Sequence, residues 1–432
     1  ATVHFPIWHQ EIEDILVLKN NKGTEDNRVR KLDYSIQISK LFYERFIKDE
    51  EITLFSPHDV PGLYEAFGMP EFDELYEKYE RSYKTPKTKI RAQELMGAML
   101  KERAETGRIY IMNIDHCNTH SSFKDKVYMS NLCQEITLPT TPVQHIDDED
   151  GEIALCILSA VNLGLIRDKD DLEELCDLSV RALDEIIDYQ EYPILAAKQS
   201  AQSRRSLGIG YIGLAHYLAK NHVAYGDKEA LELVDETTEA FQYYLLKASN
   251  QLAIEKGQCE YFEKTKYSDG ILPIDTYKKD IDKIVKRKLS YDWKQLRKDI
   301  QEHGLRHSTL SAQMPSESSS VVSNATNGIE PPRDYLSVKK SKKGTLKQIV
   351  PDYYRLKNFY TLLWDMPSNE GYINVVATMQ KYFDQAISGN WSYNPQNYKD
   401  GEVPISVMAN DLLTTYKLGW KTSYYQNTYD AK

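Results

Sequence analysis

Residues 130–136 of this chain read Ser130-Asn131-Leu132-Cys133-Gln134-Glu135-Ile136. We predict an extended backbone here, and in an extended chain side chains two positions apart lie on the same face. Asn131, Cys133 and Glu135 then share a face that carries an amide, a thiol and a carboxylate. This set indicates a reactive site, although a solvated strand edge with one buried cysteine would produce the same pattern.

The rest of the chain alternates predicted helices with short strands. This alternation favours an α/β fold, and 432 residues are enough to bury a substantial core. We find no linker, so residues 1–432 are expected to form one large domain without an internal boundary. The predicted elements include a strand over 108–112 and helices over 31–48, 170–192, 195–219 and 228–256.

Composition limits the possible partners. The net charge is −11 and the pI is about 5.5, which argues against DNA binding because phosphates attract a positive surface. The sequence contains no apolar stretch of about 18 residues or more, so we predict no membrane span. The five cysteines, without a secretory signal, fit a reducing compartment. We therefore expect a cytoplasmic protein.

Two motifs suggest cofactors that their surroundings do not support. Gly208-Ile209-Gly210-Tyr211-Ile212-Gly213 matches the dinucleotide pattern G-x-G-x-x-G, but no clear second strand follows it. We predict a packed, glycine-rich helix start instead. Asp115-His116-Cys117-Asn118-Thr119-His120 resembles a metal cluster, but no distant cysteine pair completes it. A polar turn is the better prediction, and no metal is expected in this chain.

Three further pieces are ambiguous on their own. Cys156 lies in an apolar run and suits either a small core residue or a reactive thiol. Pro315 and Ser316 begin a serine-rich stretch that suits a phosphate cradle or a simple helix cap. Tyr424 and Tyr425 are adjacent, but the chain has 31 tyrosines and most of them are expected to serve packing.

Together these pieces resemble the large subunit of aerobic class I ribonucleoside-diphosphate reductase, in its C-terminal catalytic portion. The resemblance extends over essentially the whole chain, in order and with similar spacing. The matching runs are 27–30, 52–57, 115–120, 130–139, 151–156, 204–210, 314–319, 323–333 and 424–428.

The resemblance implies roles for four residues around residue 133. Cys133 corresponds to the cysteine that becomes a thiyl radical and abstracts the ribose 3′-hydrogen. Glu135 corresponds to the base for the 3′-hydroxyl proton, and Asn131 to the amide that orients the substrate hydroxyls. Cys156 corresponds to one of two cysteines that reduce the sugar and form a disulfide in each turnover.

It also implies a substrate loop, a radical relay and a fold. Asn131, Cys133 and Glu135 would contact the nucleoside diphosphate, together with a loop that would hold its diphosphate; that loop comprises Pro315, Ser316, Glu317, Ser318 and Ser319. Tyr424 and Tyr425 would relay the radical toward Cys133. The implied fold is most of a ten-stranded α/β barrel with Cys133 on a central finger loop.

The family carries segments that this sequence lacks. Its N-terminal region holds the effector site, the first strand or strands of the barrel, and the redox partner of Cys156; its C-terminal tail holds a cysteine pair. We therefore expect an N-terminal fragment as a partner, from a split gene or a longer chain, and Ala1-Thr2 fits initiator Met removal. Further expected partners are a small subunit whose metal centre generates the radical, a dithiol reductant of the thioredoxin or glutaredoxin type, and a second large subunit.

Two other functions stay open. The chain could be a non-catalytic fragment that only binds nucleotide or docks a small subunit; retention of Cys133, Glu135, Cys156 and the tyrosine pair counts against this. It could also belong to another glycyl- or thiyl-radical enzyme. No glycyl-radical segment is recognisable near its C-terminus, and the tyrosine pair indicates a separate radical-generating subunit.

Overall fold

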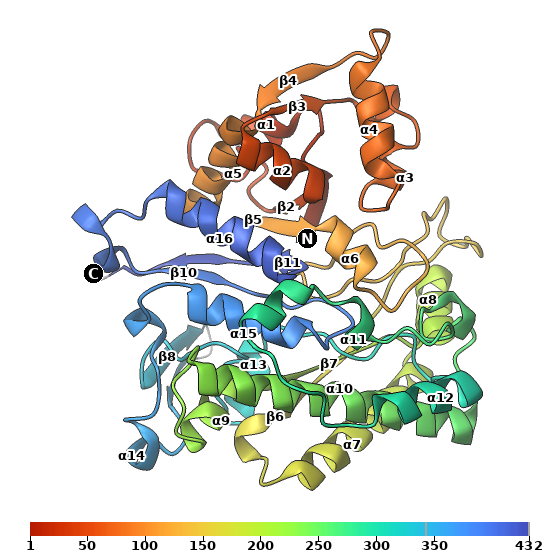
Figure 1. The fold of residues 1–432 in the computed structure, drawn as a ribbon, viewed down its shortest axis with the longest axis vertical. Helices are drawn as coiled ribbons and strands as arrows, with labels where there is room; N and C mark the ends of the chain where they lie inside the picture. The colour runs from red at the N-terminus through yellow and green to blue at the C-terminus, as the bar shows by residue number, and fades with distance from the viewer. Residues whose placement is uncertain (342–343, 431–432) are drawn as a thin grey trace.

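The computed structural model describes residues 1–341 and 344–430 (Figure 1). Its strands are β1 (Thr2–Pro6), β2 (Asp33–Ile38), β3 (Glu51–Leu54), β4 (Thr88–Arg91), β5 (Ile109–Asn113), β6 (Ile157–Asn162), β7 (Leu207–Ile212), β8 (Leu336–Ser341), β9 (Gly344–Ile349), β10 (Trp391–Tyr393), β11 (Thr422–Ser423) and β12 (Gln426–Thr428). Its α-helices are α1 (Ile12–Leu16), α2 (Lys40–Lys48), α3 (Leu63–Ala66), α4 (Phe72–Arg81), α5 (Ala92–Thr106), α6 (Ile114–Thr119), α7 (Lys169–Tyr189), α8 (Leu195–Arg204), α9 (Leu214–Lys220), α10 (Lys228–Lys256), α11 (Pro273–Thr276), α12 (Trp293–His303), α13 (Glu317–Val322), α14 (Tyr353–Leu356), α15 (Glu370–Gln380) and α16 (Ile405–Leu418).

The strands near residue 133 form one continuous hydrogen-bonded run. The first part is a sheet in the order β1-β2-β5-β11, in which β1, β2 and β5 are parallel and β11 is antiparallel to β5. The run continues through residues 385–389, because the Tyr424 amide donates to the Gly389 carbonyl. Residues 309–313 come next, followed by β7 and then β6, all in parallel register. The run therefore consists of two parallel groups that point in opposite directions. One group is β1, β2 and β5, and the other begins at β11 and ends at β6.

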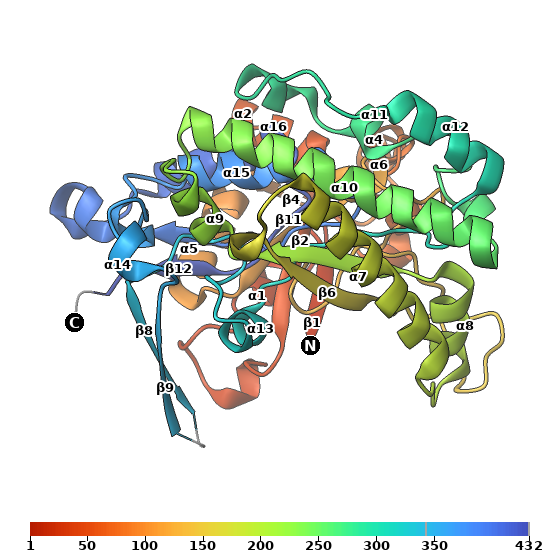
Figure 2. The same ribbon diagram turned by 90° about the horizontal axis from the view of Figure 1, so that it is seen from below.

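Helices cover the outside of this run. Figure 1 shows α1 to α5 at one end of the molecule and α7 and α10 at the other, with the C-terminal strands between them. In Figure 2, α7 lies across β6 and β7, and α10 lies beside α7. One hydrophobic core cluster extends from Ile7 to Trp420. Among the described residues, no helix has the length and apolar character needed to cross a bilayer.

The α/β class and several predicted elements are confirmed. The helix predicted over 228–256 has these bounds in the structure, and the helix predicted over 170–192 is α7. Two predictions are partly wrong. The predicted helix over 31–48 contains β2 before α2, and the predicted helix over 195–219 contains β7 between α8 and α9. β7 is buried along its whole length and its sequence shows no polar–apolar alternation. β2 does alternate polar and apolar residues along residues 33–38, a strand pattern that the helix prediction overlooked.

The glycine motif is also placed differently from the prediction. Gly208 and Gly210 lie within β7, and only Gly213, in the left-handed conformation with φ +74°, caps a helix. A Cβ on Gly208 would lie 2.8 Å from the Cys156 sulfur, and a Cβ on Gly210 would lie 2.6 Å from the Ala312 carbonyl oxygen. The glycines therefore permit close packing of neighbouring strands.

Candidate active site

Cys133 lies on the tip of a loop between α6 and β6, and the predicted extended strand is wrong here. The backbone turns at residues 132–134, and Gln134 takes the left-handed conformation at φ +72°. The buried Gln134 side chain holds this turn, because Ser35 of β2 donates to its carbonyl oxygen (2.9 Å) and its amide donates to the Asn131 carbonyl (3.0 Å). An unfavourable backbone conformation for a residue other than glycine is thus fixed by specific contacts.

The turn brings Asn131, Cys133 and Glu135 together, but by a different geometry from the alternating side chains of the predicted strand. Glu135 is buried and Leu132 is exposed, the reverse of an ordinary half-buried strand. The Asn131 side chain accepts a hydrogen bond from the Ile136 amide (3.2 Å) and also hydrogen-bonds Glu135. Ser388 hydroxyl lies within donating distance of the Cys133 carbonyl (2.5 Å) and of Glu135 Oε2 (3.2 Å).

The Cys133 thiol touches the predicted tyrosine pair. The Tyr424 hydroxyl is 3.4 Å from the Cys133 sulfur. The rings of Tyr424 and Tyr425 are stacked, with centroids 3.8 Å apart and planes inclined by 23°. Both tyrosines lie between β11 and β12, where the chain passes from one strand pair to the next. A continuous path of contacts therefore leads from Tyr425 through Tyr424 to the sulfur.

Two residues that the sequence did not single out surround this path. Tyr110 of β5 lies 4.9 Å from the Tyr424 ring and 5.9 Å from the Tyr425 ring, centroid to centroid. The Arg108 guanidinium lies 4.0 Å from the Tyr425 ring centroid, a cation–π distance. An aromatic cluster of three rings and one cation therefore borders the thiol.

Burial controls the ionisation of the site. Burial raises the pKa of the Cys133 thiol, and the hydrogen bond from Tyr424 opposes this only in part. Burial likewise raises the pKa of Glu135, against the hydrogen bonds from Asn131 and Ser388. The pKa of Tyr424 is also raised, first by burial. A thiol that keeps its hydrogen and touches a phenol suits hydrogen-atom transfer between sulfur and oxygen better than thiolate nucleophilic chemistry.

Cys156 lies directly before β6, close to the same centre. It is half-buried, and its sulfur packs against Gly208 of the neighbouring strand. The Gln385 side-chain amide donates a hydrogen bond to this sulfur (3.5 Å). Burial raises the pKa of Cys156, and Glu135 adds to the shift by its negative charge. All five cysteines are free, and the three without a predicted role, Cys117, Cys176 and Cys259, are buried.

The predicted substrate loop leads into a short helix. Ser316 has a left-handed backbone (φ +56°) and precedes α13, which begins at Glu317. Glu317, Ser318 and Ser319 are exposed, whereas Ser316 is buried. One small cavity is lined by Pro315 and Glu317 together with Ser388 and the tyrosine pair. The loop therefore lies beside the Cys133 centre.

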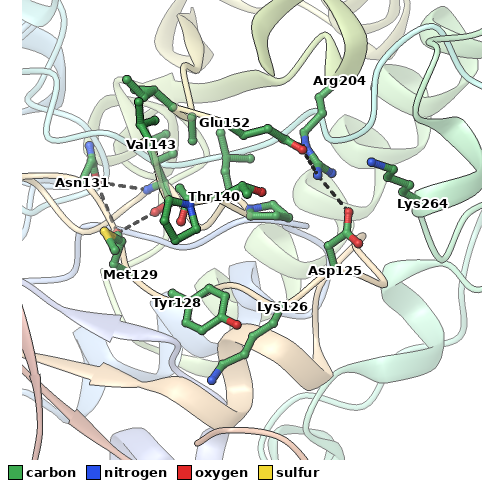
Figure 3. A pocket seen from close by; sticks show the side chains of 18 of the residues that line it. Asp125, Lys126, Tyr128, Met129, Asn131, Thr140, Val143, Glu152, Arg204 and Lys264 are labelled. Atoms are coloured by element: carbon green, nitrogen blue, oxygen red, sulfur yellow. Dashed lines mark hydrogen bonds and ion pairs between the residues drawn. The ribbon is translucent and has the colours of Figure 1, made fainter. Parts of the chain in front are cut away.

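A cavity of about 900 Å³ lies on another side of the Cys133 loop (Figure 3). Among the predicted site residues only Asn131 lines it. Arg204 lies at its far end, paired with Glu152 (2.6 Å) and Asp125 (2.8 Å), as Figure 3 shows. The thiol, the carboxylate and the tyrosines of the predicted site meet at the Cys133 centre and do not line this cavity.

Residues 115–119 lie in α6 and His120 follows its end, so the segment is not the predicted polar turn. Its polar side chains are held by protein groups: His116 Nδ1 lies 2.9 Å from the Trp420 carbonyl, and His120 contacts the Thr276 hydroxyl (2.8 Å) and the Gln380 carbonyl (2.6 Å). Within residues 1–341 and 344–430, no group of three or more His, Cys, Asp or Glu side chains is placed to hold a metal ion.

Comparison with known proteins agrees with this geometry. Residues 1–426 match the family described as ribonucleotide reductase, barrel domain. The chain belongs to this family. It is 61% identical over 436 residues to the ribonucleoside-diphosphate reductase subunit alpha of Haemophilus influenzae. The match includes all of this chain and 58% of the length of that relative. The corresponding subunits of Escherichia coli and phage T4 are 58% and 46% identical, again over all of this chain and 57% and 58% of their own lengths.

The chain thus spans a little over half the length of these relatives. The barrel-domain family and the class I alpha-subunit relatives confirm the resemblance that the sequence motifs indicated. The geometry adds Ser388, Gln385, Tyr110 and Arg108 around the predicted residues. No local motif marks them. Ser388 is 255 residues from Cys133, and Tyr110 and Arg108 contact tyrosines that lie in the C-terminal part of the chain, so only the fold brings these residues together.

Proposed function

We propose that this chain is the catalytic component of a ribonucleoside-diphosphate reductase that works by thiyl-radical chemistry. The observation that carries the proposal is the contact of Tyr424 with the Cys133 sulfur, continued by the stacked Tyr425 ring. A hydrogen atom can pass from the thiol to an oxidised Tyr424 over this contact. The thiyl radical then forms at a site shielded by surrounding protein.

Each group has a balanced part in the proposed reaction. The Cys133 thiyl takes the 3′-hydrogen atom of ribose, so an S–H bond forms and the radical moves to C3′. Glu135 accepts the 3′-hydroxyl proton, and its raised pKa makes it a stronger base once ionised. The 2′-hydroxyl leaves as water, and two thiols become a disulfide as they supply two electrons and two protons. Return of the 3′-hydrogen atom to C3′ regenerates the Cys133 thiyl, and return of the proton from Glu135 to the 3′-oxygen restores the 3′-hydroxyl and the carboxylate.

The substrate is proposed to lie between Cys133 and the substrate loop. Asn131 would hold the ribose hydroxyls, and the diphosphate would accept hydrogen bonds from Ser316, Ser318, Ser319 and the loop amides beside them. Pro315 and Glu317 would shape the same wall, since they share a cavity with Ser388 and the tyrosine pair. Hydroxyls and backbone amides can hold a phosphate without a net positive chain.

Cys156 needs a second cysteine, which we propose comes from an N-terminal fragment. Among the described residues, no strand pairs with the outer edge of β1 or of β6, the two ends of the strand run. The run contains eight segments, so two added strands would give the ten of the proposed barrel. An apolar stripe on α7, beside β6, is exposed at Leu175, Leu178 and Ile186 and would be covered by the same fragment.

The remaining partners follow from the same proposal. A small subunit with a metal centre would supply the radical to Tyr425, and a thioredoxin- or glutaredoxin-type dithiol would reduce the disulfide. Substrate is taken as a nucleoside diphosphate, and a second large subunit is expected in the assembly. Five free cysteines fit a cytoplasmic location.

The alternative is a fragment that binds nucleotide or a small subunit without catalysis. Reconstitution decides between them: the chain is mixed with the preceding region and the small subunit of the H. influenzae relative, a dithiol and a radiolabelled ribonucleoside diphosphate. We expect deoxynucleotide from the wild type and less than about 1% of that rate from Cys133→Ser and from Tyr424→Phe, because each removes an essential redox group. Wild-type activity in Cys133→Ser would refute catalysis by this chain.

A further inference from the structure

Gln385 lies at the junction of the two thiol-bearing segments. It is fully buried and begins the segment 385–389, which is hydrogen-bonded to residues 309–313. Its backbone N–H donates to the Ser311 carbonyl (3.0 Å), and its own carbonyl accepts from Lys421 Nζ (3.0 Å) and from the Gln380 side chain (2.9 Å). The backbone of Gln385 is therefore fixed from both sides.

The side-chain amide of Gln385 has one orientation that satisfies its neighbours. Its Nε2 donates to the Leu207 carbonyl (2.9 Å) and lies 3.5 Å from the Cys156 sulfur. Its Oε1 accepts from the backbone amide of Thr137 (3.1 Å), four residues beyond Cys133. The opposite orientation would place oxygen against the Leu207 carbonyl and nitrogen against an N–H donor, so the donor is directed at the sulfur.

We infer that Gln385 is a positioning residue for Cys156. Its side-chain amide holds the Cys156 sulfur against β7 and donates a hydrogen bond to that sulfur whenever the sulfur carries negative charge. This inference rests on the proposed redox role of Cys156. The same amide binds the loop that carries Cys133, so it also sets where the two thiols lie relative to each other.

The chemistry of the sulfur explains why a donor matters. Disulfide formation and reduction pass through a thiolate or a sulfur with partial negative charge. At Cys156 burial disfavours that charge, and Glu135 and Asp384 repel it; the hydrogen bond from Gln385 acts in the opposite direction. A hydrogen bond to a charged group is stronger than one to a neutral group, so its effect is largest when the sulfur is ionised.

The test measures the reactivity of Cys156 without turnover. Alkylation of the reduced 432-residue chain by iodoacetamide is followed at several pH values, and each cysteine peptide is quantified by mass spectrometry. Gln385→Leu removes both the donor and the acceptor without adding charge; Gln385→Glu keeps the volume and the acceptor for Thr137 and, once ionised, replaces the donor by a negative charge. We expect Cys156 in both variants to react about tenfold more slowly at pH 9, with its pH midpoint moved upward by about one unit.

Gln313 provides a matched control. It is also buried, and its side chain bridges to the next strand by the same amide geometry, accepting from the Tyr211 amide (3.0 Å) and donating to the Tyr211 carbonyl (2.9 Å) without touching a thiol. Gln313→Glu and Gln313→Leu should leave the Cys156 rate within about twofold of the wild type. If Gln385→Leu does not fold, Gln385→Met, which has a similar size, no N–H donor and no charge, decides the test.

Two results overturn the inference. One is a Cys156 rate within about twofold of the wild type in the folded Gln385 variants. The other is an equal slowing of Cys133, since that indicates altered packing of the loop rather than a lost donor. Failure of the proposed function is recognised separately: Cys156→Ser would then retain deoxynucleotide production in the reconstituted mixture, whatever Gln385 does to the thiol.

Discussion

At the residue scale, Glu135 combines a proposed catalytic role with a cost in stability. Its carboxyl is buried, and burial raises its pKa despite the hydrogen bonds from Asn131 and Ser388. The unfolded chain therefore ionises at lower pH than the folded chain does. Stability falls as pH rises from the unfolded pKa through the folded pKa, and above both the full penalty of burying the charge is present.

Replacement of Glu135 by Gln should remove this penalty and stabilise the chain at high pH. We expect Glu135→Gln to raise the melting temperature by about 2 °C at pH 8, the shift that about 1 kcal/mol produces in a large domain. At pH 4, where the carboxyl is largely neutral in both states, the gain should vanish. Thermal unfolding monitored by circular dichroism at the two pH values measures the difference.

Glu80 gives a control of opposite sign. Burial pushes its pKa up, but hydrogen bonds from Arg45 and Thr53 outweigh this and leave the pKa lowered. The ionised Glu80 carboxylate stabilises the fold above its unfolded pKa, and this stabilisation is lost as pH falls through its lowered folded pKa. Glu80→Gln should therefore cost more stability at pH 8 than at pH 4. If Glu135→Gln lowered the melting temperature equally at pH 8 and pH 4, burial of the Glu135 charge would not be costly.

At the element scale, β7 determines how closely Cys156 can pack. Gly208→Ala would place a Cβ 2.8 Å from the Cys156 sulfur and 2.6 Å from Leu158 Cδ2. Overpacking of this kind costs about 1–3 kcal/mol, so we expect a lower urea midpoint for Gly208→Ala. The displaced sulfur should also move away from Gln385, which would change the alkylation rate of Cys156.

Gly97 is the matched control for this substitution. It lies inside α5, and a Cβ added there would meet no other atom within 4 Å. Alanine is the better helix former, so Gly97→Ala should stabilise by about 0.5–1 kcal/mol. A loss of stability at Gly97 as large as that at Gly208 would mean that contact with Cys156 is not the cause.

The elements also show what a sequence can predict here. The pattern over 228–256 predicts a helix with both ends correct, because its apolar spacing extends over many turns. The sequence does not reveal β7, because a strand buried on both faces has no alternation and its glycines resemble a helix start. Nor does it reveal the Cys133 turn, because contacts of Gln134 with β2 and β11 impose it, and those contacts come from distant parts of the chain.

The same limit applies to the site. Motifs lead to Cys133, Glu135 and the tyrosine pair, since adjacent or alternating residues are visible locally. Ser388 and Gln385 lie 253 residues from Glu135 and 229 residues from Cys156, respectively, so that no spacing rule connects them. Their roles depend on residues 385–389 lying between β11 and residues 309–313, which only the fold establishes.

At the scale of the whole molecule, no strand among the described residues pairs with the outer edge of β1 or of β6, and the α7 stripe is exposed. Exposed strand edges carry unpaired backbone donors and acceptors, which favours association with another chain. The H. influenzae relative is longer, and this chain covers 58% of it. We expect the region of that relative preceding the match to bind this chain in 1:1 ratio, measured by co-purification and isothermal titration calorimetry.

Substitutions on α7 separate binding at this surface from association through any apolar patch. Leu178→Lys with Ile186→Lys places two charges on the stripe and should weaken the complex at least about tenfold, because burying an unpaired charge is costly. Ile254→Lys, on the exposed side of α10, changes the same kind of residue and should leave affinity unchanged. Failure of the wild-type chain to bind would refute the fragment proposal. Binding that the α7 substitutions do not weaken would confine the interface to the strand edges, and the α7 stripe would then need another partner.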